Sequence, residues 1–426
     1  MASEQDSFDV VIVGAGIQGL AQALSAAKRG HRVLVLERTK RALGASVRNF
    51  GMIWPIGQPL GVRLELALAS RRCWLEFARA AKLPLRECGS LFVATQDDET
   101  EAMESFVNTM QGSGLELRFL SRTECKRASP LVREDRVIGG MSSDTEANID
   151  PWHALACLAH WLEESHGVRF SFQEAVTHVE TDRVETSRAR SIRTSRTIVC
   201  EGLTATKLFP EAFDDASLLP CRLQMLRTAP LGSDMGPMLA TGLTLRHYPS
   251  FALGIARAED SGLAAFDRRI RSELPALDRF GIHVMVSQDH EGRLVLGDSH
   301  VYGDAALEPF RSERIDELVL AELDARFSIR ALRIEERWQG RYLKRTGHGV
   351  FVHDPMRNVR IVNGLGGNGM TLSFGIAETM WNDWSDADLL SGLADPEPLE
   401  GTAPRIESRG ELHDDLHTQP GRTFTT

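Results

Sequence analysis

Residues 8–38 constrain the fold of this 426-residue chain more than any other stretch. They read FDVVIVGAGIQGLAQALSAAKRGHRVLVLER, which predicts a strand, a glycine-rich turn, a helix over 17–28 and a second strand. The apolar runs 10–13 and 33–36 are rich in β-branched residues, as is typical of parallel strands that are buried on both faces. The pattern therefore predicts a βαβ unit within an α/β fold.

Gly14, Gly16 and Gly19 form the sequence G-x-G-x-x-G at the predicted turn. Such glycines allow a tight turn, a close approach of backbone to a pyrophosphate and close packing of helix on strand. The helix start points its amides at that phosphate, and Glu37 stands where a carboxylate accepts hydrogen bonds from a ribose. A carboxylate there disfavours a ribose 2′-phosphate, which leaves FAD or NAD. The residues expected to contact the dinucleotide here are Gly14, Ala15, Gly16, Ile17, Gln18, Gly19, Glu37 and Arg38.

The composition is that of an ordinary globular protein, with 42% hydrophobic and 25% charged residues in a chain long enough for two domains. A formal charge of −10 gives no general attraction to nucleic acid or to anionic membranes. No run of about 18 apolar residues predicts a membrane span. The polar start MASEQDS is unlike a secretory signal. We therefore expect a cytoplasmic protein without nucleic-acid or membrane partners.

The spacing of cysteine and histidine predicts no metal site. The six cysteines are scattered without a C-x-x-C pair, so reduced and mostly buried thiols are expected. Before residue 394 the histidines form no H-x-x-x-H pair. His153 and His160 lie seven residues apart, a spacing that is more often coincidence than a metal site.

The middle of the chain alternates between helical and extended patterns. An amphipathic helix is expected over 62–81, with Arg63, Arg71 and Arg72 on a solvated face. Residues 221–298 show alternating strands joined by polar turns, which predicts an antiparallel sheet. These elements are expected to build a second domain beside the βαβ unit.

Two glycine-containing segments far apart in the chain carry a resemblance to a known family. Residues 41–59 read RALGASVRNFGMIWPIGQP, and residues 359–378 read VRIVNGLGGNGMTLSFGIAE. Together with VVIVGAGIQGL and Glu37 they resemble the D-amino-acid oxidase, glycine oxidase and sarcosine oxidase superfamily of FAD-dependent amine oxidoreductases. The resemblance implies a FAD-binding Rossmann-like domain of the glutathione-reductase type, with a second substrate domain built on an antiparallel sheet.

The same resemblance divides the chain into two domains and a tail. The FAD-binding domain is expected to be discontinuous, with the substrate domain inserted into it. The expected segments are 1–80, 141–216 and 336–393 for the FAD-binding domain and 81–140 and 217–335 for the substrate domain. Residues 394–426 contain few apolar residues and are expected to form a disordered tail.

By resemblance, three segments contact the flavin: the loop over residues 41–59, here called the early loop, the segment after the third parallel strand, and the C-terminal glycine motif. A positive helix end beside the flavin stabilises its anionic reduced form. We expect non-covalent FAD, because no cysteine follows Cys221 and no histidine lies between His31 and His153, where relatives attach the cofactor. The further FAD contacts implied are Ser46, Arg48, Asn49, Phe50, Gly51, Met52, Val176, Gly202, Gly340, Gly366, Gly367, Asn368, Gly369, Met370 and Thr371.

The chemistry that the resemblance implies is the oxidation of a small-molecule amine. A hydride leaves the carbon beside the neutral amine for flavin N5, the imine hydrolyses to a carbonyl, and O2 or another electron acceptor reoxidises the flavin. Relatives bind a substrate carboxylate with an arginine two places after the glycine of a W-x-G-x-R segment. The aligned place here holds Tyr342, and a slip of one residue would supply Arg341 instead.

Three stretches resemble the branch of the superfamily that is associated with phosphonate catabolism: RNFGMIWPIGQP, ERWQGRY and GLGGNGMTLSFG. The resemblance implies oxidation of 2-aminoethylphosphonate or its N-methyl derivative to phosphonoacetaldehyde, with release of ammonia or methylamine. A phosphonate dianion needs several donors, and Met52 is expected to wall the cavity beside the flavin. The candidate donors are Arg48, Gln58, Arg246, His247, Tyr248, Arg341, Tyr342 and Lys344.

Two other functions stay open at this point. One is an ordinary glycine, sarcosine or D-amino-acid oxidase with Arg341 as the carboxylate clamp. The other is a non-catalytic flavin-binding or nucleotide-binding module, because a fold alone does not determine function.

Overall fold

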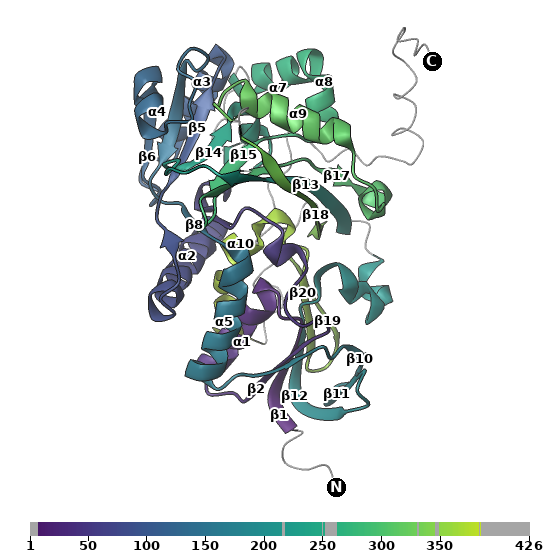
Figure 1. The fold of residues 1–426 in the computed structure, drawn as a ribbon. Coiled ribbons are helices and arrows are strands. Elements are labelled where there is room, and N and C mark those ends of the chain that lie inside the picture. Colours follow the sequence, from purple (N-terminus) through teal and green to yellow (C-terminus); the bar gives the residue numbers. More distant parts are fainter. Residues whose placement is uncertain are drawn as a thin grey trace, which may run out of the picture.

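The computed structural model describes residues 7–214, 218–248, 250–251, 262–329, 332–345, 349–382 and 384. Figure 1 shows two parts stacked one above the other, each built around a large sheet, with the N-terminal strands in the lower part. The tail expected at 394–426 lies outside the described residues. Within the described part, no helix combines the length and the apolar character that crossing a bilayer requires.

The first sheet contains the βαβ unit predicted from the sequence. β1 (Ser7–Val13) pairs in parallel with β2 (Val33–Glu37) on one side and with β12 (Ser191–Val199) on the other. The centre of β1 is fully buried, which explains its unbroken apolar run. The other strands are β9 (Arg169–Phe172), β10 (Val176–Val179), β11 (Arg183–Thr186), β19 (Phe351–Met356) and β20 (Val359–Asn363). The order is β10-β11-β12-β1-β2-β9, with β20 paired to both β12 and β19.

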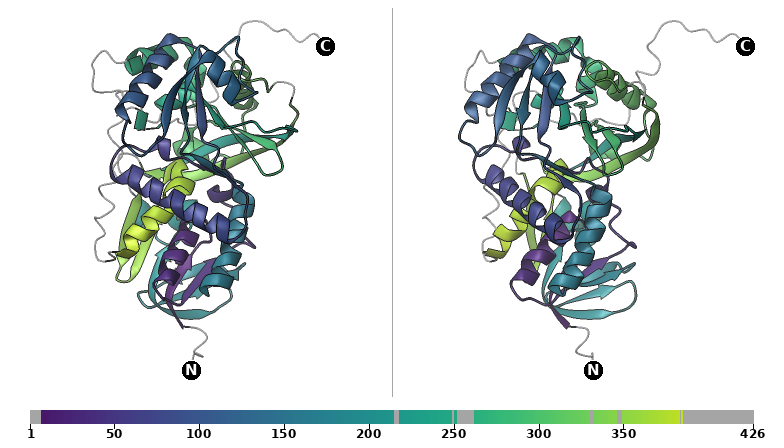
Figure 2. Two further views of the ribbon diagram at one scale, coloured as in Figure 1. Left: turned by 90° about the vertical axis from the view of Figure 1, so that its left-hand side faces the viewer. Right: turned by 60° about the vertical axis from the view of Figure 1, so that its left-hand side comes forward.

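Four helices connect this sheet to the rest of the molecule. They are α1 (Ile17–Lys28), α2 (Val62–Ala80), α5 (Pro151–His166) and α10 (Gly369–Asn382). α10 packs against both α1 and α2, and Figure 2 shows α2 and α10 crossing between the two large sheets. The crossing is close because a Cβ on Gly375 would lie only 2.3 Å from the carbonyl oxygen of Leu66.

The second sheet forms the upper part of the molecule (Figure 1) and is antiparallel except for one parallel pair, β5 with β14. Its strands are β5 (Ser90–Ala94), β6 (Leu117–Ser121), β7 (Gly139–Ser143), β13 (Leu218–Pro230), β14 (Met238–Thr241), β15 (Met285–Gln288), β16 (Arg293–Gly297), β17 (Val301–Tyr302) and β18 (Ile334–Arg345). The order is β17-β13-β16-β15-β14-β5-β7-β6, and β18 pairs with β13. The helices of this part are α3 (Asp97–Thr109), α4 (Arg122–Ala128), α7 (Gly262–Glu273), α8 (Pro275–Arg279) and α9 (Glu313–Asp324).

A third, small sheet consists of β3 (Met52–Ile53), β8 (Ala147–Ile149) and β4 (Leu85–Arg86). β3 lies within the early loop, so this small sheet holds the middle of that loop in place. Gly51 has a φ of +72°, and a Cβ there would lie 1.8 Å from the carbonyl oxygen of Ile149. Gly51, the glycine of the R-N-F-G-M segment, is therefore required because any side chain there would clash with the backbone of β8.

Two segments that were expected in the FAD-binding domain pair with strands of the second sheet. β18 pairs with β13 along most of its length, so residues 336–345 lie in the second sheet. β7 pairs with β5 and β6, which places residues 141–143 in the second sheet as well. An extended pattern predicts a strand but does not specify its partner, because the partner is fixed by tertiary contacts. The six cysteines are free, as expected, but only Cys125, Cys200 and Cys221 are buried.

Candidate functional site

The predicted glycine turn joins β1 to α1 at the edge of the first sheet. Gly14 has a φ of +104°, and a Cβ on it would lie 2.8 Å from the carbonyl oxygen of Cys200. A Cβ on Gly19 would lie 1.9 Å from the carbonyl oxygen of Gly14. Both positions exclude any side chain, so the tight turn and the close helix packing that the motif predicts are present.

Glu37, at the end of β2, stabilises this turn through hydrogen bonds. Its carboxylate accepts hydrogen bonds from the backbone amides of Ala15 and Thr39, both at 3.0 Å. The amide of Ile17 donates to the hydroxyl of Ser46 at 3.0 Å. Because Ser46 belongs to the early loop, this bond brings the loop to the start of α1.

A cavity, here called the nucleotide cavity, runs from the glycine turn past the ends of the parallel strands. Parallel α/β sheets bind their ligands at this edge. Gln18 is 8% exposed and lines the cavity, and both polar atoms of its side chain lack a hydrogen-bond partner among the described residues. The predicted cofactor residues that line this cavity are Gly14, Gly16, Ile17, Gln18, Glu37, Arg38, Ser46, Arg48, Gly202, Gly366 and Gly369.

A second cavity, here called the inner cavity, adjoins the first and is walled by residues from both parts of the molecule. The two cavities share residues of α1, the early loop, β18 and the loop before α10, so one ligand can extend through both. The predicted residues that line the inner cavity are Ile17, Ser46, Arg48, Asn49, Phe50, His247, Tyr248, Gly340, Tyr342, Lys344, Gly366, Gly367, Asn368, Gly369 and Met370.

Two substrate residues predicted from the sequence point elsewhere. Met52 pairs with Asn148 through β3 and is buried in the core of the second part, so it walls neither cavity. Arg246 forms ion pairs with Asp267 at 2.6 Å and Asp278 at 2.7 Å. The remaining predicted residues that line neither cavity are Ala15, Gly19, Gly51, Gln58, Val176 and Thr371.

Some of these buried residues support the cavity walls from behind. The hydroxyl of Thr371 accepts a hydrogen bond from the amide of Trp54 at 3.0 Å, which ties the start of α10 to the early loop. Val176 is different, because it lies in β10 at the end of the first sheet and packs in the core on that side. The contact between Val176 and the cofactor therefore stays a prediction, with the side chain in the core and outside both cavities.

The direction of β18 determines which side chains of the W-x-G segment face the inner cavity. Side chains alternate along a strand, and Gly340, Tyr342 and Lys344 line the inner cavity. Arg341 lines the nucleotide cavity instead. Its guanidinium donates to the carbonyl of Glu308 and, at 3.1 Å, to the side chain of Gln339. A carboxylate clamp at Arg341 would therefore lie on the wrong face of the strand for the inner cavity.

Arg63 is an inner-cavity residue that the sequence interpretation missed. It was expected on a solvated face of α2, but it is only 5% exposed and lines the inner cavity. The signal was present in the helical period, because Leu66, Ala67 and Ser70 on the same face are buried too. Burial lowers the pKa of Arg63 to about 10, so the guanidinium is still charged at neutral pH.

Gln58 holds Arg63 in place and connects it to the C-terminal glycine loop. Its Oε1 accepts from Nε and Nη2 of Arg63 at 3.2 and 3.0 Å, and its Nε2 donates to Asn368 at 2.9 Å. Gln58 is fully buried and does not line either cavity. It therefore acts as a positioning residue rather than as the ligand contact that the sequence predicted.

The other polar groups of the inner cavity are mostly held neutral. Burial raises the pKa of Tyr248 and Tyr342, so both hydroxyls stay protonated and can donate hydrogen bonds. Burial, with the neighbouring histidines, lowers the pKa of His247 well below its ordinary value. Burial also raises the pKa of Asp298 well above its ordinary value. The pKa of Lys344 is lowered, first by burial and then by the charge of Arg63, although Cys221 acts in the opposite direction.

Together, the glycine turn, the parallel strands and the two adjoining cavities define a dinucleotide-binding α/β protein with a second domain over its ligand site. The chain belongs to the family of FAD-dependent oxidoreductases called DAO, whose family model matches residues 9–381. It is therefore an FAD-dependent oxidoreductase. The family assignment confirms the FAD prediction, and the backbone cradle with the unpartnered Gln18 fits such a dinucleotide.

Comparison with known proteins agrees with this family. The chain is 26% identical to one of the subunits of the opine oxidase of Rhizobium meliloti, over 61% of this chain and 70% of that protein. It is 24% identical to gamma-glutamylputrescine oxidoreductase of Escherichia coli over 96% of this chain and 88% of that protein. The structure of glycine oxidase from Geobacillus kaustophilus superimposes with a TM-score of 0.72 at 17% identity, covering 92% of this chain and 100% of that one. The fold is shared, and the α/β prediction is confirmed.

Proposed function

We propose that this protein oxidises the C–N bond of an amine that carries a phosphonate, namely 2-aminoethylphosphonate or its N-methyl derivative. The products are phosphonoacetaldehyde and ammonia or methylamine. The amine class is supported by the relatives, which include part of an opine oxidase, a gamma-glutamylputrescine oxidoreductase and a glycine oxidase. The phosphonate class is supported by the charges of the inner cavity.

The observation that carries the proposal is a pair of basic side chains in the wall of the inner cavity, the buried Arg63 and the partly buried Lys344. Asp298 lines the same cavity, but burial favours its neutral form, so it adds little repulsion toward an anion. An anion bound beside Lys344 favours the protonated form of this lysine, and hydrogen bonds from charged donors are stronger than those from neutral ones. A ligand with two negative charges therefore suits this cavity better than one with a single carboxylate.

Neutral donors surround the two cations. The protonated hydroxyls of Tyr248 and Tyr342 face the same cavity and can donate to further oxygens of a tetrahedral anion. A phosphonate has three oxygens, so it can use several donors at once, whereas a carboxylate has two. The cavity thus offers more donors than a planar carboxylate needs.

The residues of the chain bind and orient the substrate. FAD, when bound, supplies the two-electron acceptor. Holding the phosphonate end at Arg63 and Lys344 fixes the distance and direction of the amine-bearing carbon from the cofactor site, which lowers the entropic part of the barrier. The amine loses two electrons and two protons to form an imine, and water then converts the imine to the aldehyde and releases the amine nitrogen.

A second candidate is the oxidation of glycine, sarcosine or a D-amino acid. It is favoured by the sequence likeness to glycine oxidase of Geobacillus kaustophilus, which is 25% identical over 39% of this chain and 46% of that protein. In that reaction Arg63 is the better candidate to bind the carboxylate, because Arg341 lines the nucleotide cavity.

The test is the reduction of the bound flavin by each candidate substrate in the absence of oxygen. The loss of the visible absorbance of the flavin measures this reduction. The panel contains 2-aminoethylphosphonate, its N-methyl derivative, glycine, sarcosine, D-alanine and β-alanine. β-Alanine is the matched control, because it has the same carbon chain as 2-aminoethylphosphonate with a carboxylate in place of the phosphonate. We expect reduction by one or both phosphonates and not by β-alanine. Reduction by carboxylates alone would refute the phosphonate proposal and support the second candidate.

A further inference from the structure

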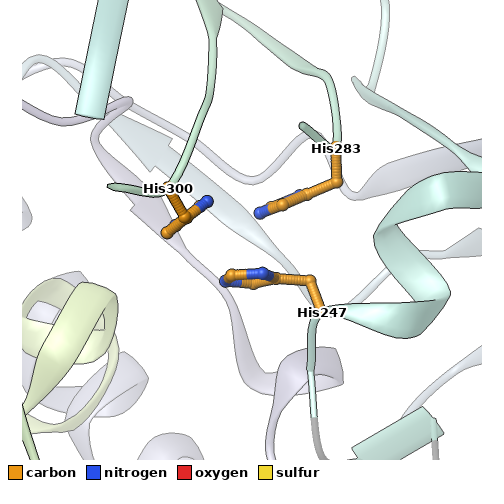
Figure 3. A group of neighbouring side chains, drawn as sticks. All are labelled: His247, His283 and His300. Carbon is orange, nitrogen blue, oxygen red and sulfur yellow. The ribbon is translucent and has the colours of Figure 1, made fainter. Parts of the chain in front are cut away.

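We propose that the inner cavity contains a binding site for a divalent transition-metal ion of the zinc class, formed by His247, His283 and His300 with Asp298 beside them (Figure 3). The sequence predicted no metal site, because the three histidines are far apart in the chain and follow no ligand spacing. The fold brings them together from three separate segments. His247 follows the turn Gly242–Arg246, His283 precedes β15, and His300 lies between β16 and β17.

The ligand atoms of the three histidines converge. All lie within 4.8 Å of one another, and Figure 3 shows nitrogen atoms of His283 and His300 directed toward each other above the ring of His247. Nitrogen ligands of a tetrahedral zinc ion lie about 3.3 Å apart, because each Zn–N bond is about 2.0 Å long. Imidazole binds a metal in its ring plane, and the rings of His247 and His283 are stacked here, with centroids 3.8 Å apart and 24° between their planes. The His247 ring therefore has to turn about its side-chain torsions before all three nitrogens can reach one ion. His247 has room to do so, because it borders the inner cavity.

Two members of the group are buried without hydrogen-bond partners. His283 is 2% exposed, and neither of its ring nitrogens has a partner in the described structure. Asp298 is 5% exposed, and its Oδ1 also lacks one, although it lies 3.3 Å from Nε2 of His283. Buried polar groups are nearly always satisfied, and an unsatisfied one calls for a ligand. One cation would satisfy both side chains at once.

His300 has the hydrogen bond that is usual for a metal-binding histidine. Its Nδ1 lies 3.2 Å from the carbonyl oxygen of Gly281, so this nitrogen carries the proton and donates it. Nε2 is then left with its lone pair and faces the cluster, 3.9 Å from Oδ2 of Asp298. Ligating histidines typically donate their other ring nitrogen to a backbone carbonyl in this way.

The protonation states agree with the geometry. Burial lowers the pKa of all three histidines, that of His300 to about 3, so the imidazoles are neutral, which is the form that binds metals. The charged group that faces them from β18 is Lys344, and its charge lowers the same three pKa values further. The rings of Tyr248 and Tyr302 also lie next to histidine rings of the cluster.

A metal ion here would also serve the proposed reaction. With three or four protein ligands it would leave coordination positions toward the inner cavity, where an oxygen of the substrate anion could bind beside Lys344. This last step rests on the proposed function, but metal binding itself does not. By resemblance, relatives bind the substrate anion with an arginine at the position that Tyr342 occupies in this chain. A metal ion at this place would supply the contact that the missing arginine cannot make.

The test is the metal content of protein that carries no histidine tag, grown with added zinc and passed through gel filtration. We expect about one zinc ion per chain by elemental analysis. The variant His283→Gln is expected to lower this content at least about tenfold. The matched control is His290→Gln. His290 belongs to a surface cluster with His153 and Asp150, in which each histidine already has Asp150 as a partner, at 3.1 and 2.7 Å.

Two controls show whether a variant has lost its metal merely because it has misfolded. They are the second variant, His300→Gln, and the flavin content of each preparation. A flavin-replete His283→Gln or His300→Gln protein without zinc supports the cavity site. Wild-type protein without stoichiometric metal, or metal that is lost in His290→Gln and kept in His283→Gln, would overturn the proposal. Metal content does not depend on turnover. A failure of the phosphonate panel would therefore refute the proposed function and leave this measurement unaffected.

Discussion

The nucleotide cavity and the inner cavity adjoin, but the first is formed mainly by backbone and the second mainly by side chains. The nucleotide cavity is shaped by backbone, with Gly14 and Gly19 at positions that admit no Cβ and with Glu37 bonded to two amides. The inner cavity is lined by charged and aromatic side chains from distant segments, among them Arg63 and Lys344. A backbone cradle recognises what all members of a family bind. Side chains on a shared scaffold then determine which substrate each member accepts.

The largest expected effect comes from filling the backbone cradle. We expect Gly19→Val to lower the free energy of unfolding by at least about 3 kcal/mol and to abolish FAD retention, because its Cβ meets the carbonyl oxygen of Gly14. The measurement is the ratio of flavin to protein after gel filtration, with thermal unfolding alongside. The control is Gly232→Asn, at an exposed turn with open space around it and a φ of +78°, which asparagine tolerates. Normal flavin content in Gly19→Val would show that side chains, not backbone, build the nucleotide cavity.

The second prediction concerns pH and the side-chain cavity. The folded-state pKa of His300 is about 3 against an ordinary 6.5, so below pH 6.5 the unfolded chain binds a proton that the folded chain does not. Stability is therefore fully present above about pH 6.5 and is lost as the pH falls toward 3, by on the order of 2 kcal/mol between pH 6.5 and 5 for this histidine. His247 and His283 act in the same direction. Asp298 acts in the opposite direction above pH 3.8, because its folded pKa is raised.

The measurement is the free energy of unfolding against pH for chelator-treated wild-type protein and His300→Gln. The variant should lose less stability on acidification than the wild type. Parallel pH profiles would contradict a neutral, buried His300.

The residues of the nucleotide cavity could be predicted from the sequence more completely than those of the inner cavity, and the reason is physical. The glycine turn, Glu37 and the loop before α10 depend on local backbone conformation, which a short motif specifies. Arg63 was misplaced because an arginine on a helix is usually solvated, although its position in the helical period matched buried neighbours. The direction of Tyr342 and Arg341 required the register of β18, and the histidine cluster required the tertiary fold.

The smallest expected effect lies far from both cavities. Ser121 and Glu124 form a capping box at the start of α4, with the amide of Ser121 donating to Glu124 at 2.8 Å. We expect Ser121→Ala to destabilise the protein by about 1 kcal/mol, because one helix amide loses its acceptor. Flavin content and substrate KM should not change. Thermal unfolding and steady-state kinetics on the same preparation measure both, and a shifted KM would mean that α4 couples to the substrate cavity.

The most direct test of the account is to remove the buried cation of the inner cavity while leaving the cradle intact. Arg63→Met keeps an unbranched apolar stem and removes the guanidinium, and Arg72→Met is the matched control, because Arg72 lies on the same helix and is exposed. We predict that Arg63→Met retains its FAD but loses about 100-fold in kcat/KM for 2-aminoethylphosphonate, since a charge-assisted contact is lost, and that Arg72→Met behaves as wild type. A flavin-replete Arg63→Met enzyme with unchanged kcat/KM would contradict the assignment of this cavity to the substrate anion.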